Sequence, residues 1–464
     1  MLKLDLTVAA MCEILEATPV GLSLRDMKRK VQLCLDSREA AKGVVFWPLK
    51  GLRFDAHDFV PQVMGKGALM SVINENRVGS LLLEAYVPVD DTTAGLLRLA
   101  KGYQRSFNLK KVAITGSNGK TTTKEMLKAI LSRKFRTFAT PGNLNNQIGV
   151  PMTIFQFKHT HEMAIVEMGT SGPDEIRPLS LSTEPHIAVI TNVGASHLEG
   201  LGSLDNVFKE KMSITAGLQK NGILVLNADD SRLCKVRSTK NYRVVTFGIR
   251  RGIYKPTELK WDENACASFK IGRTKFHLGV PGIHNLYNAL AAIAVADALR
   301  VPKSEMALAL GTFHAANMRM EIRKANGFKV VADCYNANPS STRMALETIG
   351  SVTGCHRRIA VLGDMLELGA GSKDLHREIG RLVPEMNFDL LITIGKDAKE
   401  IQEGAINGGM RPEKAIHFSN VQEANEYLSD VVRMGDILLV KGSRGMKLEQ
   451  VVDALLRLEP VLDI

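Results

Sequence analysis

Residues 111–131, KVAITGSNGKTTTKEMLKAIL, decide the fold of this chain, because a strand, a turn and a helix follow one another there. The first five residues form a run typical of a short buried strand, and apolar residues from Met126 to Leu131 recur at helical spacing. Between them, GSNGKT at 116–121 is a glycine-bounded turn with one lysine and several hydroxyls nearby. Such a turn before a helix presents free backbone N–H groups and the positive end of the helix dipole, which suits a phosphate.

The turn predicts that the chain binds a nucleotide. Lys120 would reach the outer phosphates, and the Thr121 hydroxyl would ligate Mg²⁺. The usual phosphate loop has four residues between its glycines. Here only two separate Gly116 from Gly119, and the alternative is an ordinary strand-turn-helix with a surface lysine. The residues expected to contact the nucleotide are Gly116, Ser117, Asn118, Gly119, Lys120, Thr121 and Thr122.

Length and composition describe a globular protein of several domains. A chain of 464 residues is too long for one ordinary core and predicts about three domains. The stretch at 1–21 is broken by acidic residues and fits an amphipathic helix better than a signal peptide, and ALAAIAVADAL at 289–299 is too short to span a bilayer. The six cysteines have no paired metal spacing, so we expect reduced thiols in a cytoplasmic protein without membrane insertion.

The net charge of +11 raises the question of a nucleic-acid partner. The lysines and arginines are spread along the chain, no basic run is interleaved with aromatic residues, and aromatic residues make up only 5%. A basic protein can equally attract small polyanionic substrates by electrostatic steering. We therefore expect small-molecule substrates and no nucleic acid.

Strand-like and helical runs alternate along much of the chain, which predicts an α/β fold of three domains. Residues 1–84 are expected to form a small mixed α/β domain. Residues 85–316 carry the phosphate loop and several apolar runs that end in polar residues, as in a central P-loop-type domain with a parallel sheet. Residues 317–464 alternate again between strands and helices and predict a Rossmann-like C-terminal domain.

Polar residues follow several of these strands, at the edge of the sheet where open α/β folds bind ligands. Glu167, His197, Asp333 and Asp364 all lie at or shortly after such strand ends. One acid after a strand is more often a helix cap or a turn former. Four such residues in a chain with a phosphate loop favour Mg²⁺ and phosphate chemistry, because Mg²⁺ needs only a few hard oxygen ligands. Composition and spacing leave the reaction itself open.

The phosphate loop TGSNGKTT at 115–122 is followed by seven stretches that, in this order, resemble motifs of the Mur ligases of peptidoglycan synthesis. The resemblance covers nearly the full chain, and the short loop is the form found in that family. His376 follows shortly after one of these stretches. The seven are NLNNQIGVP (143–151), EMGTS (167–171), TNVGASHLEGLGS (191–203), GIHNLYNALAA (282–292), DCYNANPSS (333–341), LGDMLELG (362–369) and LLVKGSRGMKLE (438–449).

The resemblance implies an ATP-dependent ligase that forms a C–N bond. ATP would phosphorylate the terminal carboxylate of UDP-N-acetylmuramoyl-tripeptide, and an amine would then attack the acyl phosphate. The alternatives are another amide ligase of the superfamily, such as a folylpolyglutamate synthase or a Mur ligase that adds a single amino acid, or a non-catalytic nucleotide switch. A GTPase-like switch would need a guanine-reading motif such as NKxD, and the sequence has none.

The resemblance also implies that the amine is D-alanyl-D-alanine. Ligases that add diaminopimelate carry a DNPR-like stretch, and folylpolyglutamate synthases carry a DxAHNP-like one. Here DCYNANP supplies Tyr335, Asn336 and Asn338, whose uncharged groups suit a small dipeptide better than an acidic amino acid. The alternative is that these asparagines only shape a turn before Pro339. The third peptide residue, diaminopimelate or lysine, stays open, and we expect a monomer.

The same resemblance implies two Mg²⁺ ions and a set of site residues. Lys211 matches a lysine that CO₂ converts to a carbamate, which replaces a cation by an anionic oxygen ligand; Lys209 is the rival position. The implied metal ligands are Thr121, Glu167, His197 and Lys211, and the implied catalytic set is Lys120, Glu167, His197 and Lys211. The implied ATP contacts outside the loop are Asn285 at the adenine and Arg319 and Asp333 in the C-terminal domain.

For the sugar-nucleotide substrate, the resemblance implies contacts from Ser37 and Arg38 in the first domain and from Asn145 and Asn146 in the second. The chain departs from the family pattern in three places. An acid often found before the YNANP motif is replaced by Ala332, a glycine of the first domain is replaced by Ala56, and Trp47 is bulkier than usual. The last two changes bear on the shape of the sugar-nucleotide pocket and not on the reaction.

Overall fold

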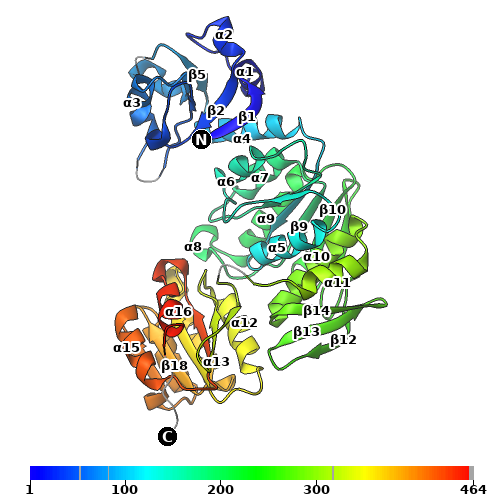
Figure 1. Ribbon diagram of the computed structural model, residues 1–464, viewed down its shortest axis with the longest axis vertical. Coiled ribbons are helices and arrows are strands. Elements are labelled where there is room, and N and C mark those ends of the chain that lie inside the picture. The colour runs from blue at the N-terminus through cyan, green and yellow to red at the C-terminus, as the bar shows by residue number, and fades with distance from the viewer. Residues whose placement is uncertain (52–53, 82, 316–317, 459–464) are drawn as a thin grey trace.

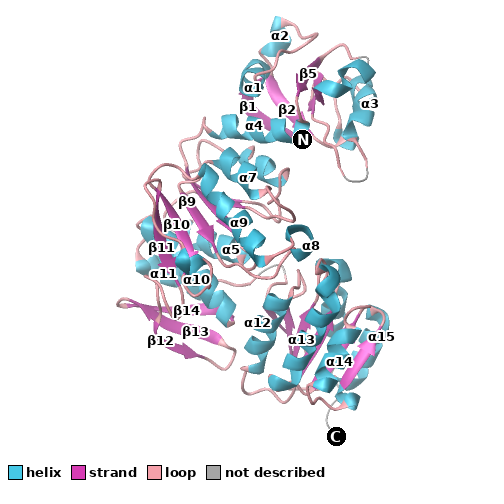
Figure 2. Cartoon of the chain, turned by 180° about the vertical axis from the view of Figure 1, so that it is seen from behind, coloured by secondary structure: helices cyan, strands magenta, loops and turns pink. Residues whose placement is uncertain are grey.

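The computed structural model describes residues 1–51, 54–81, 83–315 and 318–458, which form three α/β bodies strung along the long axis of the molecule (Figure 1). The N-terminal body lies at one end, the body with the phosphate loop lies in the middle, and the C-terminal body lies at the other end, as the view from behind also shows (Figure 2). The α/β fold of three domains is therefore confirmed. The predicted boundary at 316/317 falls outside the described residues.

The N-terminal body is built on a five-stranded sheet in the order β1-β2-β3-β4-β5, in which β1 is antiparallel to β2 and the other pairs are parallel. Its last strand lies beyond residue 84, so this sheet extends past the expected boundary. The strands are β1 Leu2–Thr7, β2 Lys30–Cys34, β3 Val45–Phe46, β4 Met70–Asn74 and β5 Tyr86–Val89. The helices are α1 Val8–Leu15, α2 Leu24–Met27 and α3 Val60–Gly65.

Two details of this body differ from expectation. The expected N-terminal helix begins only at Val8, because LKLDLT alternates between apolar and polar residues and pairs as strand β1. Trp47 is fully buried and its indole N–H donates to the Thr92 carbonyl over 2.8 Å, so its bulk fills the core of this body. Helix α4, Thr92–Gln104, then leads into the central body and contacts both α1 and α7.

The central body has a parallel six-stranded sheet in the order β11-β10-β9-β6-β8-β7. The chain moves to one side of β6 for β7 and β8 and to the other side for β9 to β11, so β6 ends at the topological switch point. The strands are β6 Lys110–Thr115, β7 Thr137–Ala139, β8 Met163–Glu167, β9 Ile187–Ile190, β10 Gly222–Asn227 and β11 Tyr242–Phe247. The helices are α5 Lys120–Leu131, α6 Gly149–Ile154, α7 Ile176–Thr183, α8 Leu198–Leu201, α9 Leu204–Met212, α10 Ile283–Ala298 and α11 Lys303–Gly311.

A small antiparallel sheet, which the sequence did not predict, is appended to the central body beneath α10 and α11 (Figure 1). Its inward side chains join the apolar core formed by α5, α10 and one face of the parallel sheet. It therefore extends the core without reaching the phosphate loop. Its strands are β12 Thr257–Trp261, β13 Cys266–Ile271 and β14 Thr274–Pro281.

The C-terminal body has a six-stranded sheet in the order β15-β16-β20-β17-β18-β19, parallel except for β15. The alternation expected from the sequence is confirmed. Its strands are β15 Glu321–Lys324, β16 Lys329–Ala332, β17 Arg358–Gly363, β18 Leu390–Ile394, β19 Ala415–Phe418 and β20 Ile437–Lys441. Its helices are α12 Pro339–Gly350, α13 Ser372–Glu385, α14 Lys399–Asn407, α15 Val421–Val431 and α16 Glu449–Leu455. Within the described ranges, no helix of the protein has the length and apolar character needed to span a membrane.

Candidate active site

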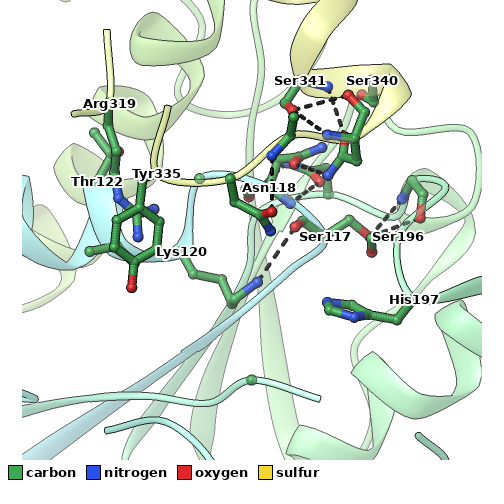
Figure 3. Close-up of a pocket in the computed structure, with 18 of the residues that line it drawn as sticks. Ser117, Asn118, Lys120, Thr122, Ser196, His197, Arg319, Tyr335, Ser340 and Ser341 are labelled. Carbon is green, nitrogen blue, oxygen red and sulfur yellow. Dashed lines mark hydrogen bonds between the residues drawn. The ribbon is translucent and has the colours of Figure 1, made fainter. Parts of the chain in front are cut away.

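A cavity of about 670 Å³ opens at the carboxyl ends of the central strands, and the C-terminal body forms its other wall. Most of the residues singled out in the sequence meet there, although they come from stretches more than two hundred positions apart (Figure 3). The predicted residues that line it are Ser117, Asn118, Gly119, Lys120, Thr121, Thr122, Asn145, Asn146, Glu167, His197, Arg319, Asp333, Tyr335, Asn336 and Asn338.

The loop after β6 has the geometry of an anion site. Gly119 adopts a φ of +80°, and a Cβ built there would lie 2.2 Å from Asn288 Oδ1, so only glycine fits. Helix α5 begins at the next residue with no side chain capping its N-terminus. The N–H groups of its first turn are therefore left for a ligand, at the positive end of the helix dipole.

Lys120 lies folded over this loop. Its Nζ donates to the Gly116 carbonyl over 2.8 Å, which places the ammonium at the mouth of the loop. Burial lowers the pKa of Lys120, Glu167 opposes that shift, and Arg319 adds to it. A phosphate entering the loop would provide an anionic partner for this cation.

Glu167, at the end of β8, is the fully buried carboxylate of the cavity. Its Oε1 accepts hydrogen bonds from the Thr121 hydroxyl at 3.0 Å and from the Asn145 amide at 2.9 Å. Its Oε2 is buried with no hydrogen-bond partner and lies 3.7 Å from Lys124 Nζ. An unsatisfied buried oxygen of this kind is costly and fits a cation.

A magnesium ion fits these donors. Within the described ranges, no three His, Cys, Asp or Glu side chains gather closely enough to hold a metal ion by themselves. Mg²⁺ does not require such a group, because it is usually bound by one or two carboxylates together with phosphates and waters. The Thr121 hydroxyl and Glu167 Oε2, which accepts no hydrogen bond from the described residues, supply that kind of partial ligand set beside the phosphate loop.

Hydrogen bonds at the cavity connect the central body to the C-terminal body. His197 adopts a φ of +53°, and its Nδ1 lies 2.9 Å from Glu367 Oε2. Burial lowers the pKa of His197, as do Lys120 and Lys211, whereas Glu367 raises it. Asn338 donates from Nδ2 to Asn118 Oδ1 over 2.8 Å and also caps helix α12 through its Oδ1. The amide therefore both shapes the turn before α12 and contacts the phosphate loop.

Charged and aromatic side chains form the wall contributed by the C-terminal body (Figure 3). The guanidinium of Arg319 lies 4.0 Å from the ring centre of Tyr335, a cation–π contact. Asp333 accepts a hydrogen bond of 2.7 Å from the buried Lys441 ammonium. Asn336 is held locally, because its Oδ1 accepts from the next backbone N–H.

The lysines of α9 have opposite environments. Lys209 is exposed, whereas the Lys211 side chain is almost fully buried. Burial, followed by the charge of Lys120, lowers the pKa of Lys211 to about 7. Lys211 itself does not line the cavity.

Several other predicted residues also lie outside the cavity. Asn285 is buried and donates its amide to the Pro281 carbonyl over 2.7 Å, while its helix neighbours His284, Tyr287 and Asn288 line the cavity instead. Asp364 accepts the backbone N–H groups of Lys396 and Ala398 and serves the loop structure. The residues named in the sequence that do not line the cavity are Gly116, Ser37, Arg38, Lys211, Asn285, Asp364 and His376.

The sequence reasoning missed several cavity residues. Lys441 and Arg444 lie in the quoted stretch 438–449, but a lysine after a strand gives no signal of its own. Glu367 lies in LGDMLELG, and its contact with His197 depends on the packing of two bodies. The residues missed in this way include Asn192, Asp229, His284, Tyr287, Glu367, Lys441 and Arg444.

Comparison with known proteins matches the central body and the C-terminal body to domains of one family. Residues 114–296 match the family model described as Mur ligase middle domain, and residues 318–444 match the one described as Mur ligase, glutamate ligase domain. The UDP-N-acetylmuramoyl-tripeptide–D-alanyl-D-alanine ligase of Bacillus subtilis (strain 168) is 34% identical over 424 residues, covering 91% of this chain and 92% of that protein. The ligase of the same name from Escherichia coli (strain K12) is 32% identical and covers 90% of this chain and 92% of its own length.

Solved structures of similar proteins also match nearly the whole chain. A crystal structure of MurF from Acinetobacter baumannii superposes with a TM-score of 0.87 at 31% identity and covers 98% of this chain and 99% of that one. A crystal structure of MurF from Thermotoga maritima in complex with ADP superposes with a TM-score of 0.81 at 28% identity and covers 92% of this chain and 97% of that one.

Proposed function

The chain belongs to the Mur ligase family, and we propose that it uses ATP to join D-alanyl-D-alanine to the terminal carboxylate of UDP-N-acetylmuramoyl-tripeptide. The reaction forms a C–N bond and yields ADP and phosphate. One observation carries this proposal: the phosphate loop of the central body and the DCYNANP stretch at 333–339 of the C-terminal body face one cavity. Relatives with the same named activity match 90% of the chain or more.

The phosphate loop is proposed to hold ATP so that its γ-phosphate faces the peptide carboxylate. The open first turn of α5 and Lys120 would neutralise the β- and γ-phosphates. Arg319, stacked on Tyr335, and Asp333, paired with Lys441, would close over the nucleotide from the C-terminal body. The likeness to a MurF whose structure was solved with ADP supports a nucleotide at this place. The buried Asn285 would act at the adenine only through Asn288, whose amide donates to Asn285 Oδ1.

Thr121 and Glu167 are proposed to hold one Mg²⁺ ion, with His197 and a carbamylated Lys211 beside a second. Bound Mg²⁺ would supply charge neutralisation for the transferring phosphoryl group. Carbamylation requires a neutral amine, and the lowered pKa of Lys211 keeps much of it neutral near pH 7. The exposure of Lys209 gives it no such advantage, so the environment favours Lys211.

The two other substrates are assigned to the outer bodies. The N-terminal body, with Ser37 and Arg38, would bind the uridine and diphosphate, and Asn145 and Asn146 would contact the same molecule from the central body. The C-terminal body would receive the dipeptide at a set of uncharged groups. These groups are Tyr335, Asn336 and Asn338.

The chemistry follows from this placement. A carboxylate is a poor acylating agent, so transfer of the γ-phosphoryl group makes an acyl phosphate, which the dipeptide amine attacks. The tetrahedral intermediate then collapses and phosphate leaves. Each step moves negative charge, and the cations and N–H groups around the cavity stabilise it in fixed positions.

Phosphate release from ATP tests the proposal. The purified chain is incubated with Mg²⁺ and ATP, with UDP-N-acetylmuramoyl-tripeptide and D-alanyl-D-alanine added separately and together. We expect phosphate and the UDP-linked pentapeptide in equal amounts only when both are present. Equal phosphate release without the dipeptide, or no pentapeptide, would contradict the proposal.

A further inference from the structure

The incoming dipeptide carries a charge that the assigned uncharged groups do not balance. Its amine must reach the acyl phosphate, and its other end is a carboxylate. A carboxylate taken into a cavity without a cationic partner is strongly disfavoured. A guanidinium is the side chain that best holds a carboxylate, because two parallel N–H donors match its two oxygens.

Four long cationic side chains line the cavity within the described ranges: Lys120, Arg319, Lys441 and Arg444. Lys120 belongs to the phosphate loop. Arg319 is stacked on Tyr335, and its buried Nε has no hydrogen-bond partner among the described residues, which fits the nucleotide contact assigned to it above. The Lys441 ammonium has three contacts, with the Asp333 carboxylate at 2.7 Å, the Asn336 carbonyl at 3.1 Å and the Asp333 carbonyl at 3.5 Å, which occupy its three donors.

The guanidinium of Arg444 has N–H donors that a ligand can use. It begins the short helix Arg444–Met446 that follows β20, and 58% of its side-chain surface is exposed. It forms an ion pair with Glu449, at 3.4 Å, and its guanidinium lies 5.8 Å from the ring centre of Tyr335. An exposed pair of this kind is weak, and a guanidinium with five N–H groups can keep it while offering its other edge to a ligand.

The backbone around Arg444 is fixed and has an apolar neighbour. Ser443 donates its N–H to the Asp364 carbonyl over 3.0 Å, and its hydroxyl accepts the Leu366 N–H over 2.9 Å. Leu366 is 45% exposed and lines the cavity, and a Cβ on Gly445 would lie 3.0 Å from its Cδ1. Leu366 thus packs close to the backbone of Gly445, the residue after Arg444, where its side chain suits the methyl group next to a carboxylate.

We propose that Arg444 binds the C-terminal carboxylate of the incoming dipeptide and, with Leu366, selects a small residue with a free carboxyl group at that end. The inference rests on the proposed function and adds a specificity-determining residue to it. The dipeptide would lie with its carboxylate at the turn after β20 and its amine toward the phosphate loop. Tyr335, which lies near the guanidinium groups of both Arg319 and Arg444, would separate the nucleotide from the dipeptide.

The test compares two proteins, the wild type and one variant, on two substrates, the dipeptide and one analogue. The Michaelis constants of the wild type and of Arg444→Ala are measured for D-alanyl-D-alanine and for D-alanyl-D-alaninamide, which lacks the carboxylate charge. We expect Arg444→Ala to raise the KM for the dipeptide roughly tenfold to a hundredfold, the range for a hydrogen-bonded charged group. For the wild type, the KM for the amide should exceed the KM for the dipeptide by a similar factor. For Arg444→Ala, the two KM values should be nearly equal.

The controls separate this role from a structural one. Arg444→Lys keeps the charge without the two-pronged geometry and should recover part of the affinity. Lys447→Gln removes an exposed cation three residues away that does not line the cavity, and should behave as the wild type. The KM values for ATP and for the UDP-peptide should change by less than about twofold in Arg444→Ala, since Arg444 is expected to contact only the carboxylate.

Two results would overturn the inference while leaving the proposed function intact: an unchanged dipeptide KM in Arg444→Ala, or an equal loss for the dipeptide and its amide. The second result would mean that the substitution disturbs the site generally and that Arg444 does not recognise the carboxylate. Absence of any turnover of the dipeptide by the wild type would instead contradict the proposed function, and this inference with it.

Discussion

Asn338 of the C-terminal body donates a hydrogen bond of 2.8 Å to Asn118 of the phosphate loop, so the two walls of the cavity contact each other directly. The same side chain caps helix α12 through its other amide atom. One residue therefore connects the start of a helix in one body to the nucleotide loop of another. Substitutions can separate these two roles.

Replacing Asn338 tests that separation. Asn338→Ala should lower the free energy of unfolding by about 1 kcal/mol, the usual effect of losing an N-cap, and should also slow turnover. Asn338→Ser keeps a capping oxygen but loses the amide donor, so its stability should stay near that of the wild type while turnover still falls. Urea unfolding and phosphate release measure the two effects. Wild-type turnover in the serine variant would show that the contact with Asn118 has no role in catalysis.

Lys120→Ala should abolish most turnover. Removing one fixed donor to a developing charge typically costs roughly 3–4 kcal/mol, on the order of a hundredfold to a thousandfold in rate. Binding of the UDP-peptide, measured by calorimetry, should be largely kept because that substrate is assigned to another body. Lys128→Ala, at an exposed position of the same helix, is the matched control. Turnover near normal in Lys120→Ala would remove this lysine from the mechanism.

Lys211→Ala should be nearly inactive if the lysine carries a carbamate. Short-chain carboxylates such as acetate should restore part of the activity by filling the vacated oxygen position. The direct observation is a carbamate signal in ¹³C NMR with labelled bicarbonate, present in the wild type and in Lys209→Ala. A signal that survives in Lys211→Ala and disappears in Lys209→Ala would assign the modification to the other lysine.

His186, at the opposite end of the central sheet from the cavity, gives a pH-dependent test of stability. Burial lowers the pKa of His186 to about 4 from an ordinary value of 6.5, with Lys111 and Lys110 adding to the shift. Between these two values the unfolded chain binds a proton that the folded protein does not, so the free energy of unfolding should fall as the pH drops from 6.5 to 4.

His186→Asn should make that pH dependence shallower. The wild type is expected to lose at most about 3 kcal/mol from this group, at roughly 1.4 kcal/mol per unit of pKa. Urea titrations at several pH values between 4 and 7 measure the slope, and His314→Asn, at an exposed position, is the control. An identical slope in wild type and His186→Asn would show that the buried ring is not responsible.

The sequence predicted the parts of the site that depend on local pattern. A glycine turn between a strand and a helix places the loop, and residues at strand ends such as Glu167 meet at one edge of a parallel sheet. The contacts His197–Glu367 and Asn338–Asn118 depend on how two bodies pack, which no local pattern encodes. Local pattern also does not show which side chains of helix α10 reach the cavity: Asn285 is buried and donates to the Pro281 carbonyl, whereas Asn288, one helical turn later, lines the cavity. The contact of Asn285 with the adenine stays a prediction.

The last prediction concerns the identity of the amine. The C-terminal wall contains the amides of Asn336 and Asn338 and the phenol of Tyr335. Arg444 is an exposed cation of the same wall, paired with Glu449 at 3.4 Å. A ligand with one carboxylate and two methyl groups balances this set, whereas a free acidic amino acid would bring a second negative charge without a partner. The measurement is a competition among D-alanyl-D-alanine, D-glutamate, L-glutamate and meso-diaminopimelate at fixed ATP and UDP-N-acetylmuramoyl-tripeptide. We expect the dipeptide to be used at least about a hundredfold more efficiently, because an unpaired buried charge costs several kcal/mol. Preference for any of the acidic amino acids would refute this assignment of the amine, and phosphate release dependent on that amino acid would still place the chain among the ligases.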